Sequence, residues 1–209
     1  MVEDERDGDE RPMTPEESLA LIATQAERTR REIGPNPAVL LGVWGLVWLF
    51  GFGLIYVSAP PTALMPLWVA AVLTVVGFAG AMTYSAIYGI RSSRGVHGPS
   101  RLVGAMYGWS WMIAFGGLTV VNTALIRLGI DADLIPLLWS GTALMLTGLM
   151  YLAGGMLWQS KLQYGLGVWI IACGAASVLA GGPYNFLVLS VAGGGGFLVA
   201  SLVFLVRAR

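Results

Sequence analysis

Charged, metal-binding and disulfide-forming residues are scarce in this chain of 209 residues. Only 11% of the residues are charged, whereas a soluble globular protein carries about 25%. The chain has one histidine, His97, and one cysteine, Cys173, so it offers no cluster of metal ligands and no partner for an intrachain disulfide. Hydrophobic residues make up 56%, and the mean hydropathy is +0.72. This composition excludes a soluble enzyme, a disordered chain and a disulfide-rich secreted domain, and it indicates a polytopic membrane protein.

Six hydrophobic segments follow residue 35, each close to the ~20 residues that cross a bilayer. Their approximate spans are 38–58, 64–89, 102–126, 134–157, 163–181 and 186–206. Pro66, Pro136 and Pro183 lie in or just before the first turns of the second, fourth and sixth segments, where proline is tolerated. We therefore predict an all-α fold in which residues 35–209 form six transmembrane helices, arranged as three hairpins.

The N-terminal part is charged instead. Residues 1–17 carry eight carboxylates against two arginines, which predicts an acidic disordered tail over residues 1–13. Thr14-Pro15-Glu16-Glu17 has the pattern of a capping box and predicts a short amphipathic cytosolic helix over residues 14–34. Its apolar residues make a candidate partner-docking face, formed by Leu19, Ile22, Ala26 and Ile33. The alternative, favoured because this apolar stripe is thin, is a juxtamembrane segment whose arginines only fix orientation.

The basic residues predict the orientation of the chain in the membrane. Nine lysines and arginines flank one side of the predicted spans, and Arg127 alone lies on the other side. Because cytoplasmic connections are enriched in basic residues, both termini are predicted to be cytoplasmic, with the protein in the plasma membrane.

The predicted spans offer little chemistry. No Asp, Glu, Lys or His lies inside a span, and the chain has no phosphate-binding loop. We therefore expect no catalytic residue, metal or cofactor. A candidate polar and aromatic site for a lipophilic or cationic ligand is formed by Asn122, Trp109, Trp111 and Ser110. The alternative, more common in membranes, is that these polar groups hydrogen-bond between helices.

Small residues mark two candidate helix-contact faces. Gly104 and Gly108 form a GxxxG motif, and Ala192, Gly196 and Ala200 recur at intervals of four around a run of four glycines. Such faces let helix backbones approach closely, either between two copies or, as is more general, inside one bundle.

Several segments resemble a group of small six-span membrane proteins from actinobacteria. The resembling segments are residues 15–19, 42–48, 104–111 and 151–159, and the similarity extends over nearly the whole chain. Members of that group are mostly described as transport-related or uncharacterised, so the resemblance implies a location in the cell membrane and no particular mechanism. The predicted three-hairpin plan is also similar in topology to the bacterial acid-resistance membrane protein family.

Two functions remain open. The first is a non-enzymatic, transport-associated or accessory membrane subunit that docks on a membrane or ATPase partner. The alternative is a facilitator or channel for a small neutral or lipophilic solute, acting as a homo-oligomer. Neither function involves nucleic acid, and both place the chain in a lipid bilayer.

Overall fold

The computed structural model describes residues 13–33, 37–92 and 99–207, apart from the side chains of residues 26–33, 37, 92, 99–100 and 207. The chain divides into two compact units, residues 1–35 and residues 36–209. Helices account for the regular structure in both units, and the described residues contain no strand.

The first unit contains helix α1 (Pro15–Ile33). The predicted capping box is confirmed: the Thr14 backbone N–H donates to Glu17 Oε2 at 2.8 Å, and the Glu17 N–H donates to Thr14 Oγ1 at 3.2 Å. The apolar side chains of Leu19 and Ile22 are exposed. Ala26 and Ile33, the other two members of the predicted docking face, lie outside the described side chains.

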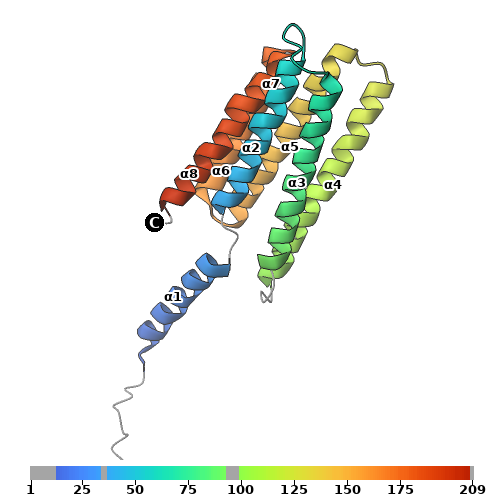
Figure 1. Cartoon of the computed structure of the whole chain (residues 1–209). Coiled ribbons are helices and arrows are strands. Elements are labelled where there is room, and N and C mark those ends of the chain that lie inside the picture. Colours follow the sequence, from blue (N-terminus) through green and yellow to red (C-terminus); the bar gives the residue numbers. More distant parts are fainter. Residues whose placement is uncertain (1–12, 34–36, 93–98, 208–209) are drawn as a thin grey trace, which may run out of the picture. The chain divides into compact units, whose positions relative to one another are not determined.

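The second unit contains six helices that are long and apolar enough to cross a membrane (Figure 1). The first five are α2 (Pro37–Ser58), α3 (Leu67–Ser92), α4 (Pro99–Arg127), α5 (Ile135–Leu157) and α6 (Lys161–Ala180). The sixth span is continuous but has three parts: α7 (Tyr184–Val188), a π-helical turn η2 (Leu189–Gly194) and α8 (Gly195–Arg207). These helices confirm the predicted all-α fold of a multi-pass membrane protein.

The three prolines stand where the sequence predicts them. Pro136 occupies the first turn of α5, Pro66 directly precedes α3, and Pro183 caps the start of α7. The second span starts at Leu67, three residues later than predicted, because the connection after α2 stays non-helical as far as Pro66. Hydropathy alone does not detect this difference, since residues 63–65 are themselves apolar.

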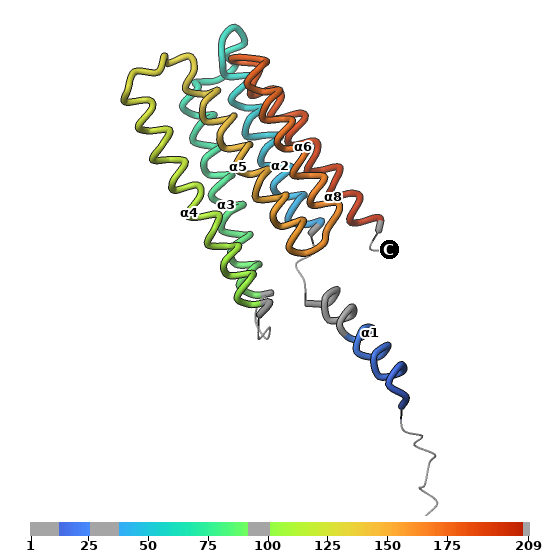
Figure 2. The backbone as a smooth tube through the Cα atoms, turned by 180° about the vertical axis from the view of Figure 1, so that it is seen from behind, coloured from blue at the N-terminus to red at the C-terminus, as the bar shows by residue number. Residues whose placement is uncertain are grey.

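The helices are packed unequally. The closest neighbours are α5 with α6, and α2 with the sixth span, while α3 packs mainly on α2 and α4 mainly on α5. Figures 1 and 2, which view the bundle from opposite sides, both place α3 and α4 toward one side and α6 and α8 toward the other. The predicted plan pairs α4 with α5 in one hairpin and begins the next hairpin with α6. In the structure α5 packs more closely on α6 than on α4, so the closest pairs are not all predicted hairpins.

Glycines spaced by seven residues bring α5 and α6 together. These glycines are Gly141, Gly148 and Gly155 on α5, with Gly167 and Gly174 on α6. A Cβ added at Gly148 would lie 2.8 Å from the Gly167 carbonyl oxygen, and one at Gly167 would lie 2.9 Å from the Gly148 carbonyl oxygen. A seven-residue spacing keeps these positions on one face of each helix, so the two backbones stay in contact along their length.

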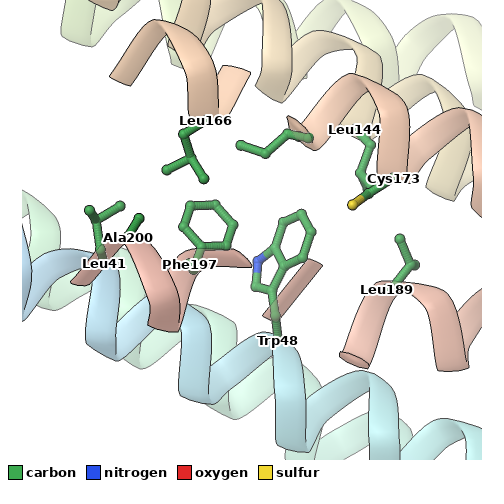
Figure 3. Packing of buried hydrophobic residues seen from close by; sticks show 9 residues of the cluster. Leu41, Trp48, Leu144, Leu166, Cys173, Leu189, Phe197 and Ala200 are labelled. Carbon is green, nitrogen blue, oxygen red and sulfur yellow. The ribbon is translucent and has the colours of Figure 1, made fainter. Parts of the chain in front are cut away.

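Apolar side chains fill the centre of the bundle (Figure 3). Trp48 of α2, Ile170 of α6, Leu189 of η2 and Phe197 of α8 are each at most 5% exposed. Cys173 belongs to the same cluster, where it serves as a small apolar side chain.

Candidate functional site

The sixth span contains a π-helical turn. It covers Leu189–Gly194 and includes the first two residues of the four-glycine run. A Cβ at Gly194 would lie 2.7 Å from the Leu49 backbone nitrogen, and one at Gly193 would lie 2.7 Å from the Trp48 ring. Glycine weakens a helix by about 1 kcal/mol relative to alanine, and this close contact with α2 offsets the loss. Single π-turns of this kind are frequent at functional positions, so the turn is a candidate site.

The predicted stripe of Ala192, Gly196 and Ala200 lies inside the bundle. The Ala192 carbonyl accepts a hydrogen bond from the Trp169 indole N–H at 3.0 Å. Gly196 lies against the same indole, and Ala200 is buried in the core. The close approach to the α2 backbone nevertheless falls on Gly194, and the approach to the Trp48 ring falls on Gly193. A spacing of four residues from Ala192 selects neither of them. The run of four glycines was the signal in the sequence that could have indicated them.

Hydroxyl groups attach the neighbouring helices to α2. Ser190 Oγ donates to the Leu49 carbonyl at 2.6 Å, and Ser201 Oγ donates to the Ala38 carbonyl at 2.7 Å. The single hydroxyl hydrogen of Thr74 is shared between the Gly51 carbonyl of α2 at 2.9 Å and the Ala70 carbonyl of its own helix at 2.7 Å. All three donors are buried. Each links α2 to a different part of the chain, so α2 is the helix to which the sixth span and α3 are both anchored.

The four residues of the predicted polar and aromatic site do not converge. Asn122 is 1% exposed and donates from Nδ2 to Thr142 Oγ1 of α5 at 2.9 Å. Trp109 is 67% exposed, and the exposed Ser110 hydroxyl donates to the Met106 carbonyl of its own helix. Trp111 is half-buried among aromatic rings and lies eleven residues from Asn122, a rise of roughly 16 Å along a helix. The structure therefore gives Asn122 the role of a hydrogen bond between helices.

The predicted GxxxG motif has no close neighbour among the residues that the structure describes. A Cβ added at Gly104 or Gly108 would meet no atom within 4 Å, and the same holds for Gly116 and Gly117 further along α4. All four glycines are exposed.

Aromatic rings connect α3 to α4 across the bundle. Successive edge-to-face contacts join the rings of Phe78, Phe52, Trp48, Phe197, Tyr151 and Trp111. Trp48 Nε1 is buried without a hydrogen-bond acceptor, and Figure 3 shows this nitrogen on the side of Trp48 that faces Phe197. The centroids of the two rings lie 5.2 Å apart at an interplanar angle of 69°, which is an edge-to-face contact.

The chemistry available to these sites is hydrogen bonding and apolar packing. Among the described residues no three His, Cys, Asp or Glu side chains gather as metal ligands. An open apolar groove of about 760 Å³ lies between α5 and α6, with Thr142 as its one hydroxyl-bearing side chain. No protein family, curated protein or solved structure matches the chain.

Proposed function

We propose that the protein is a non-enzymatic membrane subunit, and that α4 binds the partner protein inside the bilayer. The observation that carries this proposal is the weak attachment of α4. Asn122 is the one buried residue in the span Arg101–Arg127, and it is polar. A helix held in this way has most of its surface available to another protein.

The outer face of α4 is suited to a second helix. It is formed by Trp109, Ile113, Gly116, Gly117 and Val120, whose three large side chains are each at least 67% exposed. The two glycines leave a notch between Ile113 and Val120, into which a partner backbone can fit.

Glycines at the contacts between the other helices support this interpretation. A Cβ added at any of four of them would lie 3.0 Å or less from a backbone atom of a neighbouring helix; they are Gly45, Gly148, Gly167 and Gly194. The open glycines of α4 also weaken their helix, by about 1 kcal/mol each relative to alanine, but no close backbone contact among the described residues offsets this loss. A partner helix on the outer face of α4 would supply this contact.

The filled core supports a subunit over a solute facilitator. Trp48, Ile170, Leu189 and Phe197 occupy the centre of the bundle, so a solute path through one copy would need this packing to open. A facilitator would therefore need a path between copies, which makes homo-oligomerisation the feature that separates the two functions.

The proposal includes a cytoplasmic location for both termini. Exposed Leu19 and Ile22 on α1 then give a cytosolic partner, such as an ATPase subunit, an apolar contact. The nine basic residues on that side of the predicted spans support this orientation.

Affinity purification from native membranes tests the proposal. The C-terminally tagged chain is extracted in mild detergent, and its partners are identified by mass spectrometry and native mass. We expect a stoichiometric second protein that is lost with Gly116→Leu and retained with Gly80→Leu, because Gly80 of α3 is equally open. Recovery as a monomer would contradict the proposal, and a complex of identical chains would favour the facilitator.

A further inference from the structure

Three buried polar residues lie in the helix ends next to the connections between α4 and α5 and between α6 and α7. Figure 1 shows both connections at the end of the bundle opposite the end of α8. The three residues are Ser140 of α5, Ser177 of α6 and Asn185 of α7. Each lies four residues from a member of the central apolar cluster, namely Leu144, Cys173 and Leu189. Residues four apart share a helix face, and all three steps run toward the same end of the bundle. The three polar residues therefore form the next layer of the core.

The Asn185 side chain has no hydrogen-bond partner in the protein. Both Nδ2 and Oδ1 are buried and unpaired, and the residue is 0% exposed. Every other buried polar side chain of the described residues makes a hydrogen bond, apart from the Trp48 indole that faces Phe197. Asn122 is the matched comparison, because its equally buried amide donates to Thr142.

The two serines of this layer retain unused acceptors. Ser140 Oγ donates to the Leu137 carbonyl at 3.2 Å, and Ser177 Oγ donates to the Gly174 carbonyl at 2.8 Å. Each hydroxyl hydrogen is thus used within its own helix, while oxygen lone pairs remain. The layer therefore presents hydroxyl and amide oxygens together with the two N–H donors of Asn185.

A buried amide without partners is unfavourable, so a molecule that both donates and accepts hydrogen bonds is favoured there. A cation suits the oxygens but not the Nδ2 donors, and the layer contains no carboxylate. We propose that Ser140, Ser177 and Asn185 form a buried hydration site that holds a water molecule. The water accepts from Asn185 Nδ2 and donates to the free oxygens, which links the start of the sixth span to α5 and α6. This site is independent of the proposed partner surface on α4.

Asparagine-selective ¹⁵N labelling tests the site in the full-length protein in lipid nanodiscs. The chain has three asparagines, Asn36, Asn122 and Asn185, and Asn36→Gln and Asn185→Gln variants assign their side-chain signals. The measurement is the rate at which magnetisation passes from water to each side-chain amide. We expect transfer to Asn185 to be at least threefold faster than to Asn122. Equal, slow transfer at both amides would overturn the proposal.

A second variant tests the serines without altering the asparagine. Ser177→Ala removes one anchor of the water, so transfer to Asn185 should fall at least twofold while Asn122 is unchanged. Ser110→Ala, at an exposed serine of α4, is the control and should leave both rates unchanged. An unaltered Asn185 rate in Ser177→Ala would show that the three residues do not share one site.

Discussion

Ser190 donates a hydrogen bond to the Leu49 carbonyl at 2.6 Å, and a Cβ added at Gly53 would lie 3.2 Å from the same hydroxyl. Ser201 repeats this relationship with the Ala38 carbonyl and with Gly42, where the Cβ would lie 3.3 Å away. In a helix the carbonyl of residue i points toward residue i+4, so glycine at i+4 leaves that carbonyl accessible to a second donor. Two glycines of α2 thus create two acceptor positions for the sixth span.

Removal of one of these hydroxyls should loosen the sixth span. We expect Ser190→Ala to lower the free energy of unfolding by about 1 kcal/mol, the usual contribution of a hydrogen bond between membrane helices. Ser110→Ala should change it by less than about 0.5 kcal/mol, because Ser110 is exposed and bonds only within α4. Denaturant unfolding in detergent micelles measures both, and equal effects would argue against the α2 anchor.

The contact between Gly148 and Gly167 should tolerate no side chain. Gly148→Val places methyl groups against the Gly167 carbonyl and Ile171, so we expect a loss of roughly 3 kcal/mol or more in unfolding free energy. Gly80→Val is the control, since a Cβ at Gly80 meets no atom within 4 Å. If both variants unfold at the same denaturant concentration, the close packing of α5 and α6 is incorrect.

The attachment of α4 should depend on Asn122 and Thr142 together. A double-mutant cycle with Asn122→Ala and Thr142→Ala should give a coupling free energy of about 0.6–1 kcal/mol. The unfolding free energies of the four proteins in detergent supply the cycle. Strictly additive effects would mean that the two side chains do not interact.

Deletion of residues 1–33 should leave the six-span unit folded, because the two units are separately compact. We expect normal membrane insertion and an unfolding temperature within a few degrees of that of the full chain, measured by scanning fluorimetry. The proposed cytosolic contact predicts that recovery of the partner falls in the same variant. A truncated chain that fails to insert would show that the N-terminal unit is needed for the fold.

The spans and helix starts are predictable from the sequence because they depend on local properties. Apolar length determines a membrane span, Pro136 suits a first helical turn, and Thr14 with Glu17 forms a capping box from four consecutive residues. These features require no knowledge of neighbouring helices, so composition and short motifs suffice for them.

The contacts between helices are less predictable because small residues do not identify their partners. Gly104 and Gly108 carry the better-known motif yet meet nothing within 4 Å, whereas Gly148 and Gly167 touch across two helices. Burial of Asn122 follows from its polarity in an apolar span, but Thr142 as its acceptor depends on how α4 and α5 align. The π-helical turn adds a residue to one turn of the sixth span, which shifts every later position away from a regular spacing.

Site-specific photo-crosslinking in native membranes tests the partner surface most directly. A photoreactive residue replaces Ile113 on the outer face of α4, and a matched one replaces Val75 of α3, since these side chains are 71% and 67% exposed. The proposed subunit role predicts one discrete protein adduct from position 113 and none from position 75. Lipid adducts alone at both positions, or a protein adduct only from position 75, would contradict it.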